Sequence, residues 1–265
     1  MPTPTLVVHY HIFKVGGTTI TKSLRRRFRD GFVEIDKLKS TVGTPLNAEA
    51  IKRILVERPE MRACSAHRLV ANVHLDASLD VFPITFLRHP LLRAASAWRF
   101  ARARTDASEF ADSAKSLALG EWLEWCLSPG QLIECRNYQS RVLSTRDDGT
   151  ASHWLDGDVL RGDFDEAARR LAAMPMGCVG IVEEYDLSAR AIEVAARDRG
   201  LELKIDSRPA NATKVVDDWQ AELAAVEAEI PRTVLDRFYE ANADDLAMFE
   251  RYRARLLAMP EHAAI

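Results

Sequence analysis

Apolar residues gather in short runs separated by longer stretches in which apolar and charged residues alternate. Two of these runs, over 6–12 and 81–87, have the length of strands, and further ones occupy 31–35, 61–66 and 176–182. Short apolar runs bounded by polar segments are typical of strands that are buried on both faces of a sheet. The pattern therefore predicts a sheet built from these five segments.

Between the apolar runs the spacing changes to that of helices. After Gly17, the residues Ile20, Leu24 and Phe28 follow one another at intervals of four, with charged residues between them, which favours an amphipathic helix. Further helices are predicted over 48–56, 90–104, most of 106–124, a segment that starts at Asp163 as N-cap, 188–197, 214–228 and 231–256. Strands that alternate with helices predict an α/β fold, with a central parallel sheet flanked by helices on both faces.

The composition is that of a globular protein with a sizeable core. The chain has 265 residues, of which 47% are hydrophobic, and it shows neither internal repeats nor a low-complexity linker. We therefore expect a single domain over 1–265. No apolar run reaches the roughly 18–20 residues of a membrane span, and no signal peptide is evident. The four cysteines form no C-x-x-C pair, which favours free core thiols and predicts a cytoplasmic protein.

Charge is distributed unevenly along the chain. Residues 1–110 hold 18 Lys and Arg against 10 Asp and Glu, and residues 111–265 hold 18 against 29. A basic N-terminal half suits a small ligand with several negative charges. Nucleic acid is not expected as a partner, because the pI is near 6.2 and the basic residues are not interleaved with exposed-looking aromatics.

The first strand leads directly into a glycine turn and a helix. Gly16 and Gly17 can adopt positive φ and let a ligand approach the backbone, while the start of the helix directs N–H groups and the positive end of its dipole toward one point. Lys14 adds a positive charge, and Thr18 and Thr19 add hydroxyl donors. The segment therefore predicts an anion site. It is not a nucleotide-triphosphate loop, in which the lysine follows the glycines.

The sequence HIFKVGGT at 11–18 resembles a known phosphosulfate-binding loop. It is similar to the H-I-P-K-T-G-G-T loop of sulfotransferases in the family that includes the heparan and chondroitin uronyl sulfotransferases and many bacterial relatives. The loop departs from the family pattern at Phe13, where proline is usual, and at Val15, where threonine is usual. The threonine hydroxyl that could hold an anion is therefore missing at position 15.

A second resemblance lies where the run over 81–87 gives way to a helix. The family's 3′-phosphate motif has the form L-R-D-P-x-x-R-x-x-S-x-Y, and residues 87–98 follow it except at His89 and Trp98. Arg88 and Ser96 match the pair that holds the 3′-phosphate in that family, and a guanidinium suits a phosphate because it can bind two oxygens at once. Weaker similarities follow in the family's order over 137–143, 180–188 and 242–249.

The resemblance implies a P-loop-like sulfotransferase fold and a specific chemistry. Members transfer a sulfuryl group from 3′-phosphoadenosine 5′-phosphosulfate (PAPS) to a hydroxyl, here expected on a carbohydrate or glycolipid, and release adenosine 3′,5′-bisphosphate (PAP). No metal is expected. The cofactor-binding residues implied are Lys14, Gly16, Gly17, Thr18, Thr19, Arg88 and Ser96. Lys14 is also expected to be catalytic, because it can neutralise charge on the bridging oxygen as the S–O bond breaks.

An acceptor hydroxyl also needs a general base. His67 is the expected base, since it matches a strand-end histidine of the family, and His74 is the alternative. Two other functions stay open at this point. One is a nucleotide-dependent phosphotransferase, for which the sequence has no Walker-type lysine–serine pair. The other is a noncatalytic binding protein on the same fold, which the departures at Val15 and His89 would favour.

Overall fold

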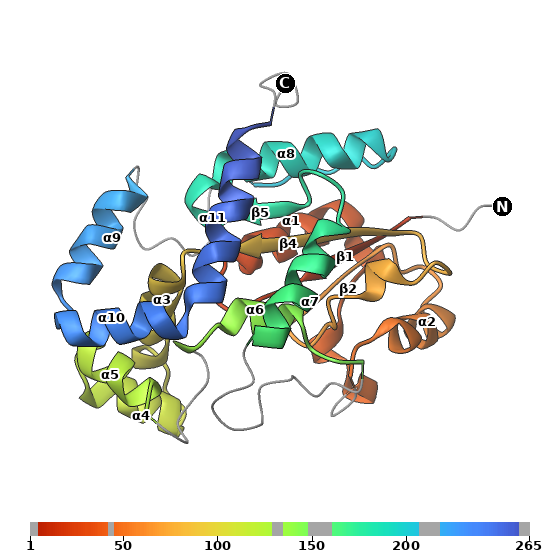
Figure 1. The fold of residues 1–265 in the computed structure, drawn as a ribbon. Coiled ribbons are helices and arrows are strands. Elements are labelled where there is room, and N and C mark those ends of the chain that lie inside the picture. The colour runs from red at the N-terminus through yellow and green to blue at the C-terminus, as the bar shows by residue number, and fades with distance from the viewer. Residues whose placement is uncertain (1–4, 42–44, 129–134, 148–160, 207–217, 260–265) are drawn as a thin grey trace.

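A computed structural model describes the chain over 5–41, 45–128, 135–147, 161–206 and 218–259. Its centre is a five-stranded sheet in the order β2-β3-β1-β4-β5, with every neighbouring pair parallel (Figure 1). The strands are β1 (Leu6–Tyr10), β2 (Phe32–Glu34), β3 (Ala63–Ala66), β4 (Val81–Leu87) and β5 (Val179–Ile181). The predicted α/β class with a parallel sheet is confirmed.

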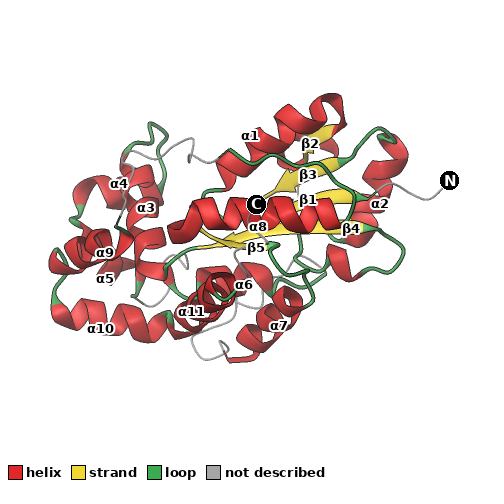
Figure 2. Ribbon diagram, turned by 90° about the horizontal axis from the view of Figure 1, so that it is seen from above, coloured by secondary structure: helices red, strands yellow, loops and turns green. Residues whose placement is uncertain are grey.

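Helices cover both faces of this sheet, as predicted. Figures 1 and 2 show α1 and α8 over one face and α2 and α7 over the other. In the described part of the chain the helices are α1 (Gly17–Phe28), α2 (Ala48–Glu57), α3 (Pro90–Arg102), α4 (Glu109–Ser116), α5 (Leu119–Cys126), α6 (Tyr138–Leu143), α7 (Arg161–Ala172), α8 (Tyr185–Asp198), α9 (Trp219–Ala228), α10 (Arg232–Ala241) and α11 (Ala243–Leu257).

The strand order determines where a ligand can bind. The chain leaves β1 toward β2 at one edge of the sheet and leaves β4 toward β5 at the other edge, although β1 and β4 are neighbours. Adjacent parallel strands whose connections diverge in this way form a topological switch point, and ligands of open α/β sheets bind at the carboxyl ends of such strands. Both predicted anion motifs follow these two strand ends.

A second group of helices lies beyond the carboxyl end of the sheet. Helices α3, α4, α5, α9 and α10 gather there (Figure 1) around an apolar cluster that includes Leu92, Trp122 and Phe238. Trp219 of α9 packs against both this cluster and the larger one around the sheet. The organisation as a single domain stays a prediction.

Two predicted helix boundaries are wrong. The helix expected over 231–256 is divided at Asn242, whose side chain donates to Phe238 O (2.8 Å) and Cys135 O (2.7 Å) and accepts from Asn137 N (3.0 Å). Because the amide side chain competes for the helix carbonyl, α10 ends there and α11 begins afterwards. Asp163, the expected N-cap, lies inside α7 instead. The first residues of the helix expected over 214–228 lie outside the described residues.

Two further properties bear on the sequence-based expectations. No helix in the described ranges combines the length and apolar character needed to cross a bilayer. Cys64, Cys126, Cys135 and Cys178 are all buried and free, as expected for core thiols.

Candidate active site

The corner between β1 and α1 has the form of an anion site. Gly16, the N-cap of α1, has φ 76°, and a Cβ on Gly17 would overlap the imidazole ring of His11, so both positions require glycine. No side chain caps α1, and its first turn contains no acidic residue. Among the described residues no acceptor is found for the N–H groups of Gly17 and Thr18, which are therefore open to a negatively charged ligand.

Lys14 stands at this corner in an unusual backbone conformation. Its φ of 66° is one that non-glycine residues adopt at a cost of about 1–3 kcal/mol, and such residues gather at functional sites. Its Nζ lies 4.6 Å from the centre of the Phe100 ring and 5.8 Å from that of Phe13. Burial, reinforced by the nearby charge of Arg88, lowers the pKa of Lys14. Within the described residues the ammonium makes no hydrogen bond and remains available to a ligand.

Arg88 lies at the end of β4, in a second strand-to-helix corner between β4 and α3, and connects this corner to the one between β1 and α1. Its Nη1 donates to Lys14 O at 3.2 Å, so the two predicted anion-binding segments are in direct contact. Gln139 fixes the Arg88 backbone by accepting from Arg88 N and donating to Arg88 O, each at 2.8 Å. No residue in the described part of the chain accepts from Nη2 of Arg88, which leaves this nitrogen for a ligand.

Two residues that support Arg88 were not predicted from the sequence. The side chain of Glu183 is buried, and its Oε1 accepts from His89 N at 3.1 Å and lies 3.7 Å from Arg88 Nε. Burial raises the pKa of Glu183 to about 7 against the opposing effect of Arg88. Gln139, which bonds to the Arg88 backbone, is the second supporting residue. Both belong to segments that resemble the family, but spacing alone gives no sign that they contact Arg88.

Asp245 of α11 holds Gln139 in place through a hydrogen bond from its backbone N–H. Its carboxylate is completely buried and accepts from Gln139 N (2.9 Å), Ser140 N (2.8 Å) and Ser140 Oγ (2.8 Å). A chain of contacts therefore runs from α11 through α6 to the Arg88 backbone. The segment 242–249 resembles the family, but its spacing alone does not predict that a C-terminal helix positions Arg88.

His67 follows β3 and is exposed. Its ring stacks on the His11 ring with centroids 3.9 Å apart, and its Nδ1 lies 2.7 Å from His11 O. Because a carbonyl oxygen only accepts, Nδ1 must carry the proton of this bond, and the basic lone pair of the neutral ring is on Nε2. The Phe13 ring lies 6.5 Å from the His67 ring and 5.8 Å from Lys14 Nζ.

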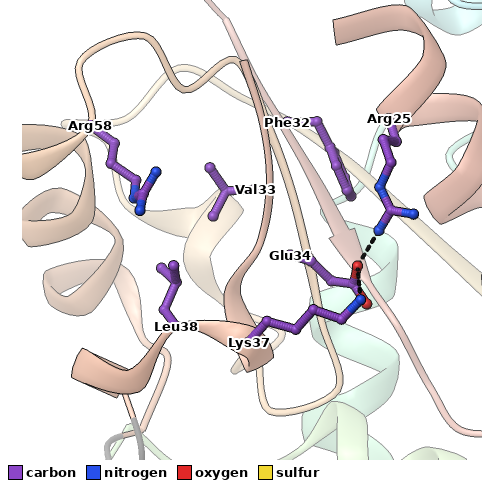
Figure 3. Close-up of a pocket in the computed structure, with 7 residues that line it drawn as sticks. All are labelled: Arg25, Phe32, Val33, Glu34, Lys37, Leu38 and Arg58. Carbon is purple, nitrogen blue, oxygen red and sulfur yellow. Dashed lines mark hydrogen bonds and ion pairs between the residues drawn. The ribbon is translucent and has the colours of Figure 1, made fainter. Parts of the chain in front are cut away.

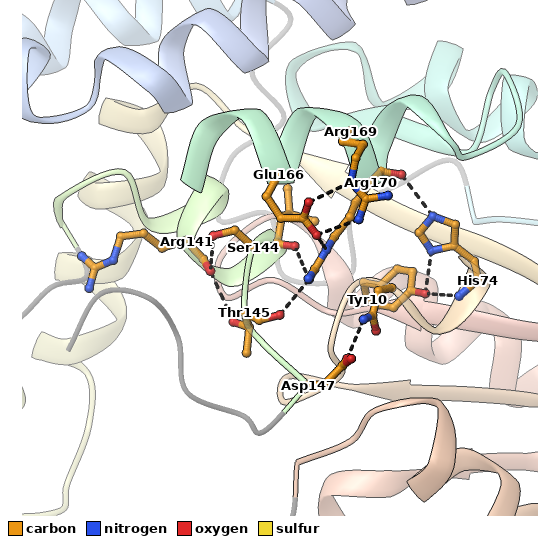
Figure 4. Close-up of polar contacts among 11 residues, drawn as sticks. Tyr10, His74, Arg141, Ser144, Thr145, Asp147, Glu166, Arg169 and Arg170 are labelled. Carbon is orange, nitrogen blue, oxygen red and sulfur yellow. Dashed lines mark hydrogen bonds and ion pairs between the residues drawn. The ribbon is translucent and has the colours of Figure 1, made fainter. Parts of the chain in front are cut away.

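His74, the alternative base, has both ring nitrogens engaged (Figure 4). Its Nε2 donates to Arg170 O at 3.1 Å, and its Nδ1 accepts from the Tyr10 hydroxyl at 2.9 Å. Burial lowers the pKa of His74 to about 4. This histidine joins β1 to the end of α7, and its nitrogens are not open to an acceptor hydroxyl.

The two predicted threonines differ in their surroundings. Thr18 is partly buried, and its hydroxyl has no hydrogen-bond partner among the described residues. Thr19 is 2% exposed; its N–H donates to Gly16 O at 3.1 Å and its side chain interacts with the Tyr185 phenol. The donors of Thr19 are thus already occupied, whereas the hydroxyl of Thr18 is open.

Ser96 and two of the departures from the family pattern, Val15 and His89, lie in different surroundings. Ser96 is partly buried on α3 and makes no polar contact with Arg88 in the described structure. Val15 is completely buried and so directs no atom toward an anion. His89 is 5% exposed and packs among the Trp219, Tyr239 and Phe249 rings. An aromatic environment of this kind accommodates imidazole better than carboxylate.

Two cavities of the described structure lie away from this corner. The larger, of about 280 Å³, lies beside β2 (Figure 3) and is lined by Arg25, Phe32, Val33, Glu34, Lys37, Leu38 and Arg58. The other, of about 110 Å³, is lined mostly by apolar residues between the end of α7 and β5 and by residues of α11, among them Met174, Leu256 and Arg255. Neither contains a residue that the sequence predicts to be functional.

Comparison with known proteins establishes no family. No protein-family model matches the chain. An uncharacterised protein of Archaeoglobus fulgidus is 25% identical over 252 residues, which cover 93% of this chain and 95% of that protein. The crystal structure of a sulfotransferase from Alicyclobacillus acidocaldarius is similar over 93% of this chain and 99% of that one, with 16% identity and a TM-score of 0.40. At such values the likeness identifies neither fold nor activity, so function is argued from the site.

Proposed function

We propose that this protein is a PAPS-dependent sulfotransferase of the type that includes the uronyl sulfotransferases. The observation that carries the proposal is the contact between Arg88 Nη1 and Lys14 O at 3.2 Å. This contact brings Lys14, which precedes the uncapped start of α1, next to Arg88, whose Nη2 is open to a ligand. Both residues lie at the switch point of the parallel sheet. Two adjacent anion-binding groups suit one ligand that carries an anion at each end.

The residues present fit such a ligand. The open N–H groups of α1 and the hydroxyl of Thr18 would hold the 5′-phosphosulfate, with Gly16 and Gly17 allowing close approach. Arg88, together with Ser96, would hold the 3′-phosphate. When bound, the cofactor supplies the sulfuryl group. Lys14 would stabilise the negative charge that develops at the leaving oxygen, as a positioned cation does in phosphoryl transfer.

His67 is the proposed general base. Its Nε2 carries the lone pair because Nδ1 donates to His11 O, and that bond also fixes the orientation of the ring. It would accept the proton of the acceptor hydroxyl as the hydroxyl attacks. A carbohydrate or glycolipid is the proposed acceptor, following the resemblance of the loop and the 3′-phosphate motif. We also propose that the protein works in the cytoplasm, in keeping with its free buried cysteines.

Incubation with PAPS and a panel of acceptors tests the function. The panel should contain uronic-acid polysaccharides, neutral oligosaccharides, glycolipids and phenols, with sulfated product and PAP both quantified by mass spectrometry. We expect sulfation of at least one sugar hydroxyl. Binding of PAP without product from any acceptor would instead indicate the noncatalytic binding protein, and absence of both would exclude the proposal.

Replacing His67 by alanine should lower kcat by about 10²-fold, the usual contribution of a general base, with PAP affinity and Tm unchanged. His74→Ala is the matched comparison. It removes a buried residue that links Tyr10 to Arg170, so it should lower Tm and leave the kcat of the folded fraction near that of the wild type. A wild-type kcat in His67→Ala would remove His67 from the mechanism.

Replacing Arg88 by alanine should weaken PAP binding by about 10–100-fold, because a charge-assisted hydrogen bond contributes about 1.5–3 kcal/mol. Adenosine 5′-phosphate, which lacks the 3′-phosphate, should lose less than about threefold. Arg99→Ala is the control, because Arg99 is exposed on α3 and paired with Glu222 at 3.2 Å, so its loss should leave both affinities nearly unchanged. Equal weakening of both ligands in Arg88→Ala would contradict the assignment of the 3′-phosphate to Arg88.

A further inference from the structure

Glu183 is a buried carboxyl group with an incomplete set of partners. It belongs to the short 3-10 helix η6 (Val182–Glu184) that follows β5, and its side chain is 2% exposed. Its Oε1 accepts from His89 N, but its Oε2 is buried and has no hydrogen-bond partner. A buried carboxylate oxygen without a donor is costly, whereas a protonated carboxyl can itself donate a hydrogen bond at that atom.

The charged groups that face Glu183 come from several elements. Arg88, at the end of β4, approaches its Oε1 to 3.7 Å. Glu222 of α9 faces it with a like charge, and the buried imidazole of His89 follows Arg88 in the chain. The neighbouring Glu184 is turned away and pairs with Arg253 of α11 at 2.7 Å. Arg88 is therefore the one cation of the described structure that holds Glu183 in its ionised form.

We propose that Glu183 is a positioning residue that takes up a proton from solvent when a phosphate dianion binds Arg88. The proposal rests on the function proposed above. In the free protein at pH values above 7, Glu183 is mostly ionised and directs the Arg88 guanidinium by its charge. A bound phosphate dianion forms an ion pair with this guanidinium and places two further negative charges near Glu183. The Glu183 carboxylate then loses its pairing with Arg88 and is repelled by the phosphate. Protonation of the carboxylate removes both unfavourable interactions.

The consequence for binding has a definite sign. Burial already raises the pKa of Glu183 to about 7, and a bound dianion raises it further. The complex therefore binds more protons than the free protein at pH values above 7, and linkage requires the affinity to fall as pH rises through that range. A glutamine at position 183 is neutral at every pH, so it should remove this dependence.

Calorimetric titration of the whole protein with PAP at pH 8, in two buffers of different ionisation enthalpy, measures the proton uptake directly. At this pH the phosphate groups of PAP are already dianionic, because their second pKa is about 6, and they add little to the count. We expect the wild type to take up roughly 0.5–1 proton per PAP bound. This count needs no variant and decides the proposal by itself.

Two variants assign the proton to its residue. Glu183→Gln should bind PAP without proton uptake and, at pH 8, about 10-fold more tightly than the wild type. Glu184→Gln, which changes the adjacent carboxyl that pairs with Arg253, should keep the wild-type proton count and its pH profile. PAP binding by the wild type with no proton uptake, or an unchanged count in Glu183→Gln, would overturn the role of Glu183 and leave the proposed function standing. No PAP binding by any of the three proteins would overturn both.

Discussion

Replacing Lys14 by alanine is expected to lower the rate of sulfuryl transfer by about 10²–10³-fold, the effect typical of removing one group that stabilises charge in a transition state. Lys14 shortly precedes the open start of α1, and the only described contacts of its ammonium are the Phe13 and Phe100 rings and the field of Arg88. Steady-state kinetics with a saturating acceptor measures the loss as a fall in kcat.

The fold should survive this substitution. The φ of 66° at position 14 strains alanine about as much as lysine, since both are L-residues with a Cβ, and the carbonyl that Arg88 contacts is retained. Lys22→Ala, which removes an exposed lysine of α1, is the matched control and should keep the wild-type kcat. A Lys14→Ala protein with normal Tm and a normal kcat would mean that Lys14 has no part in the transfer.

Replacing Asp245 by alanine should destabilise the protein by about 3–5 kcal/mol. The carboxylate is completely buried, and its loss leaves Gln139 N and Ser140 N without an acceptor, whereas the Ser140 hydroxyl keeps Asn137 O at 3.0 Å. Each unsatisfied buried donor costs about 1–3 kcal/mol, and the cavity adds to this total. Denaturant unfolding followed by circular dichroism measures the change in the free energy of unfolding.

Two comparisons make the result specific. Asp236→Ala, which removes an exposed aspartate of α10 paired with Arg232, should change the free energy of unfolding by less than about 0.5 kcal/mol. Asp245→Ala should also weaken PAP binding in the folded fraction, because Asp245 holds Gln139 and Gln139 holds the Arg88 backbone. An Asp245→Ala protein as stable as the wild type would show that this network contributes little to the fold.

The local patterns of the sequence were sufficient for the fold class. The apolar run over 81–87 matches β4 residue for residue, because a strand buried on both faces is almost entirely apolar. Its one polar residue, Thr85, is buried and donates to Tyr10 O at 3.2 Å. Gly16 and Gly17 marked the turn before α1 correctly, since one requires positive φ and the other a close approach to His11. Both signals are local. A chain in which strands and helices alternate has few other ways to bury the apolar faces of these elements.

What the sequence did not reveal depends on contacts between distant segments. Asn242 ends a helix because it reaches Asn137 and Cys135, more than a hundred residues earlier. Glu183 and Gln139 support Arg88 only because η6 and α6 are packed against the end of β4. The sequence already favoured His67 over His74 by resemblance, but the open Nε2 of His67 and the two engaged nitrogens of His74 follow from hydrogen bonds to His11 O, Tyr10 and Arg170 O. No spacing rule predicts which ring nitrogen stays open.

The central claim is that the Lys14 and Arg88 corners hold the two ends of one ligand, and a comparison of three nucleotides tests it most directly. Wild-type affinity should be measured by calorimetry for PAP, adenosine 5′-phosphate and adenosine 3′-phosphate under identical conditions. We expect one PAP per chain, bound at least about 10-fold more tightly than either monophosphate, because each end contributes its own charge-assisted contacts. PAP binding no tighter than that of adenosine 5′-phosphate would contradict the claim.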